Sequence, residues 1–154
     1  MLELSFGKND ETHPGAQNMV KVEPAGRPHC LRCKTMELSE LDSPEGISFF
    51  ECPKCHRPFA RKSGGALCFR WLHPISLILY PVIFEANPGQ SCERVADMFA
   101  KQESSERIKL IVQEIELELD DPTQQIRDIL DCHASEDDLR KYLRCVAGRL
   151  TRIA

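Results

Sequence analysis

The sequence predicts an α+β protein in which a small β module is followed by three or four helices. Three observations support this fold class. Two Cys-x-x-Cys pairs are separated by eighteen residues with a turn signal between them. Apolar and polar residues alternate around these pairs, as they do in strands. After Asn87-Pro88-Gly89 the apolar spacing changes from two residues to about 3.6, which is typical of helices.

Composition and charge indicate a globular chain with two dissimilar parts. Hydrophobic residues make up 42% and charged residues 29% of the 154 positions, which suits one domain or two very small ones. The net charge of −4 belongs to residues 91–154, which carry ten basic and fourteen acidic side chains, while residues 1–90 carry ten of each. The two parts should therefore present different surfaces.

The first 28 residues are polar and show no periodicity, so we expect a disordered tail. They lack the basic and apolar regions of a secretory signal, which favours a cytoplasmic location. Because cytosolic thiols stay reduced, the eight cysteines would then indicate metal binding rather than disulfides. The apolar run 66–84 contains Arg70 and His73, and its charge-free part, 71–84, is shorter than the about 20 residues of a membrane span. We expect this run to pack inside the protein, without membrane contact.

Residues 29–86 form the predicted β module and its apolar extension. The turn sequence Asp42-Ser43-Pro44-Glu45-Gly46 should join two strands. Residues 75–84, rich in β-branched and aromatic side chains, are compatible with a buried strand or with an irregular packed segment. The expected strand positions are Met36 and Leu38, residues 47–50, and Leu67, Phe69 and Trp71 on one face of a third strand.

Residues 91–154 form the predicted helical segment. Four helices are expected, and each can begin at a residue suited to the N-cap position. These residues are Ser91 for the first helix, Ser104 or Ser105 for the second, Asp121 (followed by Pro122) for the third, and Ser135 for the fourth. The apolar stripes of these helices are Cys92, Val95, Ala96 and Phe99; Ile108, Ile111, Val112, Ile115 and Leu119; Ile126, Ile129 and Leu130; and Leu139, Tyr142, Leu143, Val146, Ala147 and Leu150.

The two cysteine pairs predict one zinc ion per chain, bound by Cys30, Cys33, Cys52 and Cys55. Zinc prefers four soft ligands in a tetrahedron, and each Cys-x-x-Cys turn can direct two thiolates to one point. A hairpin between the pairs would bring the four sulfurs together. A module of about 45 residues buries too little apolar surface to fold unaided, so the metal should contribute much of its stability.

Residues 29–72 resemble the zinc-ribbon family through Cys30-Leu-Arg-Cys33 and Cys52-Pro-Lys-Cys55. The resemblance implies a small β fold around a four-cysteine zinc site. The family includes nucleic-acid binders, protein adapters and enzyme appendages, so the fold does not determine the function.

The sequence departs from the family at the residue after each pair, where a glycine is usual and Lys34 and His56 stand instead. The departure leaves His56 or His29 open as a competing ligand.

Cys52 to His56 also forms a Cys-x-x-Cys-His string, as in c-type haem proteins. Without an export signal, and with the first pair then unexplained, we expect no haem. We also expect no redox role for either Cys-x-x-Cys pair, because neither lies in the βαβ context that is typical of redox-active pairs.

A basic cluster follows the second pair and predicts possible phosphate contacts to a nucleic acid. The alternative is that cations near the site offset the net charge of −2 of four thiolates around Zn²⁺. The isoelectric point of about 5.7 disfavours nucleic acid as the main partner. The candidate nucleic-acid contacts are Lys54, Arg57, Arg61 and Lys62; the candidate compensating cations are Arg32, Lys34, Lys54 and Arg57.

The remaining chemistry-bearing residues have structural interpretations. His73 is expected to be packed, and no set of side chains indicates catalysis. Cysteine and histidine residues near the C-terminus could form a second metal site, but they lack the Cys-x-x-Cys spacing of the first one. We expect Cys68, Cys92, Cys132 and Cys145 to be small core residues. The possible second metal site would consist of Cys132, His133 and Cys145. We expect Glu114, Glu116 and Glu118 to form a solvated face.

The sequence therefore favours a non-enzymatic zinc-binding protein that serves as a protein-binding or regulatory module. The alternatives are a nucleic-acid-binding module associated with transcription or translation, and a non-catalytic subunit of an enzyme complex. We expect the protein contact, with a partner or a second copy, to use residues 91–154, because Leu110 and Leu117 lie outside the second helical stripe.

Overall fold

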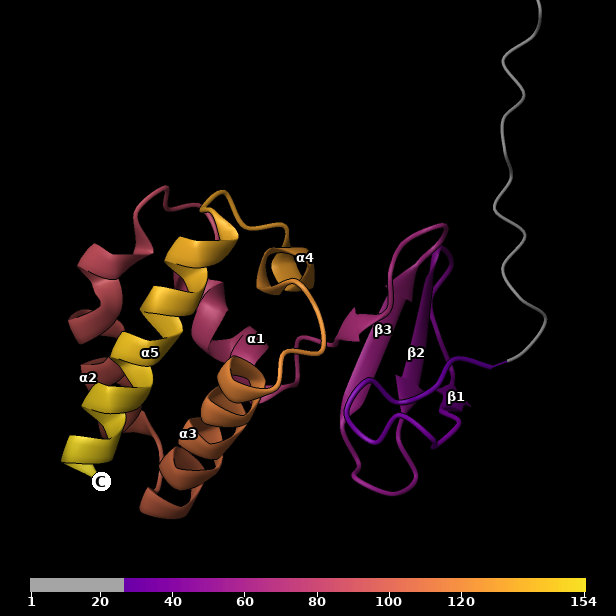
Figure 1. Ribbon diagram of the computed structural model, residues 1–154, viewed down its shortest axis with the longest axis horizontal. Helices are drawn as coiled ribbons and strands as arrows, with labels where there is room; N and C mark the ends of the chain where they lie inside the picture. The colour runs from indigo at the N-terminus through magenta and orange to yellow at the C-terminus, as the bar shows by residue number, and fades with distance from the viewer. Residues whose placement is uncertain (1–26) are drawn as a thin grey trace, which may run out of the picture.

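The computed structural model describes residues 27–154, so the predicted tail lies outside the described residues except for Arg27 and Pro28. A small β-sheet occupies one end of the described chain and a group of helices the other (Figure 1). This arrangement confirms the predicted α+β class, with the helices following the sheet in the sequence.

The sheet is a four-stranded antiparallel meander in the order β1-β2-β3-β4. Gly46, with φ of +82°, forms the turn between the first two strands, where a residue with a Cβ atom would be strained. Ser43 stabilises the same turn, since its hydroxyl accepts a 2.7 Å hydrogen bond from the Phe49 amide. The strands are β1 (Ser39–Leu41), β2 (Ile47–Glu51), β3 (Pro58–Lys62) and β4 (Cys68–Phe69).

The strand β3 was missing from the sequence prediction. Its sequence, PFARK, shows little alternation, and it becomes a strand because all five residues pair with β2. The predicted third strand shrinks to β4. Phe69 is buried against Phe59 with ring centroids 5.4 Å apart, but Trp71 is 46% exposed. The expectation that Leu67, Phe69 and Trp71 share one face of a strand was therefore wrong, because the chain turns after Arg70.

The apolar run that follows is neither a strand nor irregular, which corrects both alternatives for residues 75–84. It forms α1 (Pro74–Leu79) and the 3-10 helix η1 (Tyr80–Val82). Pro74 occupies the first turn, and His73 caps the helix by accepting a hydrogen bond from the Ile75 amide. The fully buried residues, at the i, i+3, i+4 and i+7 spacing of a helix, are Ile75, Ile78, Leu79 and Val82.

Three of the four predicted helices begin where expected. Ser104 and Ser135 accept hydrogen bonds from the amides of Arg107 and Asp138, as N-cap residues do. Ser91 stands at the N-cap of its helix, but its hydroxyl bonds the Glu85 carboxylate instead. The helices of this region are η2 (Pro88–Ser91), α2 (Cys92–Gln102), α3 (Ser105–Asp120), α4 (Ile126–Leu130) and α5 (Glu136–Ile153).

The start of α4 was predicted too early. It begins at Ile126, not after Asp121, because the Glu136 carboxylate accepts hydrogen bonds from the amides of Ile126 and Arg127. This carboxylate lies on another helix and satisfies donors that Asp121 was expected to satisfy locally. A tertiary contact thus replaces the predicted local cap.

The helical core forms around α5, which packs against α2 and α3 (Figure 1). All six residues of its predicted stripe are buried. The Tyr142 hydroxyl donates a 2.8 Å hydrogen bond to the Ile78 carbonyl and so links α5 to α1. Within residues 27–154, no helix is both long and apolar enough to span a bilayer.

A disulfide between Cys92 and Cys145 joins α2 to α5. The expectation that every thiol stays reduced was therefore wrong for this pair. Cys145 is also exposed rather than a core residue, because it lies beside the buried stripe of α5. Cys92 and Cys132 are buried as predicted, and Cys68 is half-buried.

The substitution Tyr142→Phe should destabilise the fold by about 1–3 kcal/mol, because it leaves the buried Ile78 carbonyl without a donor. Chemical denaturation followed by far-UV circular dichroism measures the effect. The matched control is Tyr80→Phe, since Tyr80 is 70% exposed and should tolerate the change. Equal stability of the two variants would contradict the role given to this hydrogen bond.

Candidate metal centre

Four cysteine sulfurs from the two predicted pairs meet at one place and could hold a metal ion. The ligand atoms of Cys30, Cys33, Cys52 and Cys55 all lie within 4.8 Å of one another. The Sγ atoms of Cys30 and Cys55 are 3.7 Å apart, and those of Cys33 and Cys52 are 4.0 Å apart. A tetrahedral ion with metal–sulfur bonds of about 2.3 Å requires sulfur–sulfur distances of about 3.8 Å. The observed spacing fits that requirement.

Each cysteine pair lies in a tight turn that is closed by backbone pairing. The first turn precedes β1 and is closed by the Cys30 amide bonding the Met36 carbonyl at 2.8 Å. The second joins β2 to β3 and is closed by the Cys52 amide bonding the Arg57 carbonyl at 3.2 Å. The sheet therefore holds both turns, called knuckles below, with their sulfurs directed at one point.

The backbone of each knuckle also directs an amide at the sulfur of its first cysteine. The Cys33 amide lies 3.3 Å from the Cys30 sulfur, and the Cys55 amide lies 3.4 Å from the Cys52 sulfur. An N–H group that points at sulfur stabilises negative charge there. The two knuckles are thus built alike, which is consistent with a zinc-ribbon-like site.

The residues that replace the usual glycines keep the glycine-like backbone conformation. Lys34 has φ of 59° and His56 has φ of 58°, both in the left-handed region. Their amides bond the carbonyls of Cys30 and Cys52 and complete the turns. The departure from the family pattern therefore preserves the turn geometry at a steric cost.

Neither histidine beside the knuckles belongs to the sulfur cluster. His29 is exposed, and His56 directs its Nδ1 atom to the Glu51 carboxylate at 3.3 Å. The group within ligand distance consists of the four cysteines. In the described chain, Cys132, His133 and Cys145 form no second metal group, because Cys145 is bonded to Cys92.

The surroundings of the cluster separate the thiol pKa values. Burial raises the pKa of Cys30 above its ordinary value. Burial also acts to raise the pKa of Cys55, but hydrogen bonds from the Arg57 backbone and side chain outweigh it and lower the pKa to about 7. Of these two thiols, Cys55 is therefore the better prepared to bind a metal at neutral pH.

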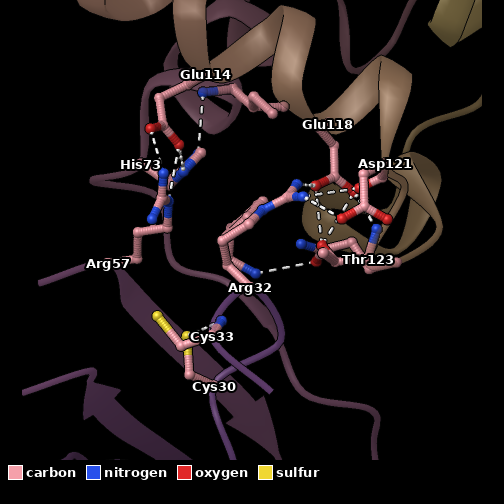
Figure 2. A network of polar contacts seen from close by, with 12 residues as sticks. Cys30, Arg32, Cys33, Arg57, His73, Glu114, Glu118, Asp121 and Thr123 are labelled. Atoms are coloured by element: carbon pink, nitrogen blue, oxygen red, sulfur yellow. Dashed lines mark hydrogen bonds and ion pairs between the residues drawn. The ribbon is translucent and has the colours of Figure 1, made fainter. Parts of the chain in front are cut away.

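Two glutamates of α3 are buried, which corrects the prediction that Glu114, Glu116 and Glu118 form a solvated face. Only Glu116 is exposed, whereas the Glu118 side chain is 1% exposed and Glu114 is buried. Their partners are Arg57 and Arg32, which come from the two knuckles (Figure 2). No local pattern indicates this pairing, because the partners are more than 50 residues apart.

The first pair is a bidentate contact that also includes a histidine. Arg57 donates from Nη2 and Nε to the two Glu114 carboxylate oxygens at 2.6 and 2.9 Å. His73 approaches the same carboxylate, with Nε2 3.0 Å from Oε2 (Figure 2). Burial alone would raise the pKa of Glu114, but the hydrogen bonds from His73 and Arg57 lower it to about 2.

His73 is packed, as expected, and its two ring nitrogens have different roles. Nδ1 accepts the hydrogen bond from the Ile75 amide, so the proton of the neutral ring lies on Nε2 and is donated to Glu114. Burial lowers the pKa of His73 and favours this neutral form. The ring stacks on Phe69 with centroids 3.7 Å apart, which connects the sheet to α1.

The second pair is equally well enclosed. Arg32 donates to Glu118 at 2.6 Å and to the side chain and carbonyl of Asp121 at 3.1 and 2.9 Å. Glu118 also accepts hydrogen bonds from the amide and hydroxyl of Thr123 (Figure 2). These bonds fix the end of α3 against the first knuckle.

The four residues proposed to contact nucleic acid have different surroundings. Arg57 is engaged with Glu114, and Lys62 forms an exposed ion pair with Asp131 at 2.9 Å. Arg61 lies over the Phe50 ring at 5.6 Å, and Lys54 is exposed beside the second knuckle. A nucleic-acid contact at these residues stays a prediction.

The chain matches no family model, and no curated protein or solved structure is significantly similar to it. The fold and the cysteine cluster therefore define its class as an α+β protein with a four-cysteine site that could hold a metal ion.

The substitution Lys34→Gly should stabilise the protein by about 0.5–1 kcal/mol, because glycine adopts the left-handed conformation without a Cβ clash. Denaturant unfolding of the metal-loaded protein measures the gain. Lys54→Gly is the control, because Lys54 is exposed in the other knuckle and has no positive φ, so glycine should destabilise it. A loss of stability in Lys34→Gly would contradict the expected backbone strain.

Metal affinity should rise with pH, because a thiol must lose its proton to bind the ion. Each thiol that releases a proton makes the apparent affinity about tenfold higher per pH unit. Above pH 7 the slope should decrease by about one proton, since the pKa of Cys55 is about 7. Chelator competition between pH 6 and 9 gives this slope. Cys132→Ala, outside the cluster, should leave it unchanged, and an affinity independent of pH would contradict thiolate binding.

Proposed function

We propose that this chain is a non-enzymatic zinc-binding protein in which the β module is the structural scaffold of a protein-binding or regulatory module. The observation that carries the metal part is the close approach of four sulfurs within 4.8 Å. Four thiolates in a tetrahedral arrangement favour zinc among the common metals. Four protein ligands leave no open position for a substrate or water, as in structural sites.

Bound zinc would cross-link the two knuckles and supply folding free energy to a sheet with a small core. Two of its strands have only three and two residues, and β1 is exposed throughout. A sheet of this size buries little apolar surface, so an additional cross-link should be needed for stability. The residues that would hold zinc are Cys30, Cys33, Cys52 and Cys55.

The protein-binding part of the proposal is supported by apolar side chains that the fold leaves exposed. The predicted stripes of α2, α3 and α5 are largely buried against one another, but Leu110 of α3 is exposed. In the apolar extension, Tyr80 is exposed and Phe84 is 82% exposed. Aromatic side chains are frequent anchors of protein contacts. No observation favours the nucleic-acid or enzyme-subunit alternatives, and Arg57 already has a carboxylate partner.

Protein purified under reducing conditions should contain about one zinc per chain, because the four thiolates form a single site. Cys52→Ser should bind zinc much more weakly, whereas Cys132→Ala, which removes a thiol outside the site, should bind it normally. Elemental analysis and chelator competition measure both properties. Absence of tightly bound zinc from the reduced wild-type protein would refute the metal part.

The same samples test association. For the zinc-loaded chain, light scattering should show self-association, or affinity capture from native cells should retain a protein partner. Phe84→Ser or Leu110→Ser should abolish that contact, because each removes an exposed apolar side chain. Tyr80→Phe, which keeps the apolar ring, serves as the control. A zinc-loaded chain that stays monomeric at high concentration and captures nothing would remove the protein-binding part.

A further inference from the structure

The two knuckles are attached to the same helix through one arginine each. Arg32 lies between the cysteines of the first knuckle, and Arg57 lies two residues after the second cysteine of the other. Their partners, Glu118 and Glu114, are four residues apart on α3 and so face the same side. Figure 2 shows both arginines extending from the cysteine region towards this helix.

The carboxylates are also held in place by contacts from the helical side. Glu118 accepts hydrogen bonds from the amide and hydroxyl of Thr123, and Glu114 accepts one from the neutral His73 ring. These contacts orient the carboxylates but leave their negative charges uncompensated. A buried charge without a cationic partner is strongly unfavourable, so in the docked arrangement both carboxylates require their guanidinium partners.

The arginines, in turn, depend on the geometry of the metal site. The Arg57 carbonyl accepts the hydrogen bond from the Cys52 amide that closes the second knuckle. Arg32 is part of the turn in which the Cys33 amide points at the Cys30 sulfur. An ion that draws the four sulfurs together therefore also fixes the positions from which both side chains reach α3.

We propose that Glu114 and Glu118 are positioning residues of the metal site, acting through Arg57 and Arg32, so that metal binding and docking of the sheet on α3 are one linked equilibrium. The inference rests on the proposed zinc function. Linkage is reciprocal: the factor by which the docked helix raises zinc affinity equals the factor by which zinc favours docking. The metal site would thus control the orientation of the helical segment relative to the sheet.

Zinc affinity of the full chain, measured by competition with a chromophoric chelator, tests the inference. Glu114→Gln and Glu118→Gln remove one charge each and keep nearly the same shape. Loss of residues that support metal ligands commonly weakens binding by about 10–100-fold, and we expect this range for the double variant. Glu116→Gln is the matched control, because it removes the same charge from the exposed face of the same helix and should change affinity less than about twofold.

A second control separates linkage through the ion pairs from general destabilisation. Val146→Ala shortens a buried side chain of α5 and should weaken the helical core while both ion pairs remain. We expect it to lower the thermal midpoint and to leave zinc affinity unchanged. In the wild-type protein, chelation of zinc should accelerate hydrogen exchange at the C-terminal half of α3 more than in α2, a readout that requires no substitution.

The outcomes distinguish the inference from the function on which it rests. A wild-type protein that binds no zinc would overturn the zinc function itself. Tight zinc binding by the wild type with unchanged affinity in the folded double variant would overturn the linkage alone. Equal loss of affinity in Val146→Ala and in the double variant would assign the effect to global folding and also overturn it. If the double variant does not fold, unchanged exchange of α3 upon chelation in the wild type decides against the linkage.

Discussion

The arrangement of the sheet and the helices depends on the need to neutralise two buried carboxylates on α3. Glu114 and Glu118 lie on the side of the helix that faces the cysteine site, and only charged partners make their burial tolerable. Arg57 and Arg32 supply these partners from the two knuckles. Removing one member of a buried pair typically costs about 3–5 kcal/mol, so the two ion pairs strongly favour the observed contact between the sheet and α3.

His73 connects the layers around this charge network. It caps α1 with Nδ1, donates to Glu114 from Nε2, and stacks on Phe69 of β4. Its neutral form serves all three contacts, because Nδ1 can accept only when unprotonated. The same side chain thus joins the sheet, the first helix and the helix that carries the carboxylates. Polar and apolar contacts at this junction reinforce each other, and Tyr142 then links α1 to the central α5.

Six of the eight cysteines form two groups with different chemistry. Four thiols form the cluster, and they must be reduced and deprotonated to bind a metal. Cys92 and Cys145, in the helical half, form a disulfide. Paired spacing identified the first group from the sequence, because two residues between cysteines suit a turn that chelates an ion. The disulfide had no comparable signal, since its partners are 53 residues apart and meet only when α2 packs on α5.

The sequence by itself determined the α+β order, the four clustered cysteines and the helical stripes, because these follow from local spacing. Ser104 and Ser135 cap their helices through bonds within three residues, and the stripe of α5 repeats at helical period. The tertiary structure alone decided β3, the start of α4 and the burial of the α3 glutamates. In each case the deciding partner lies elsewhere in the chain: β2 for β3, Glu136 for α4, and the knuckle arginines for the glutamates. Local pattern cannot reveal a carboxylate's burial when the cation that makes it favourable is brought close only by folding.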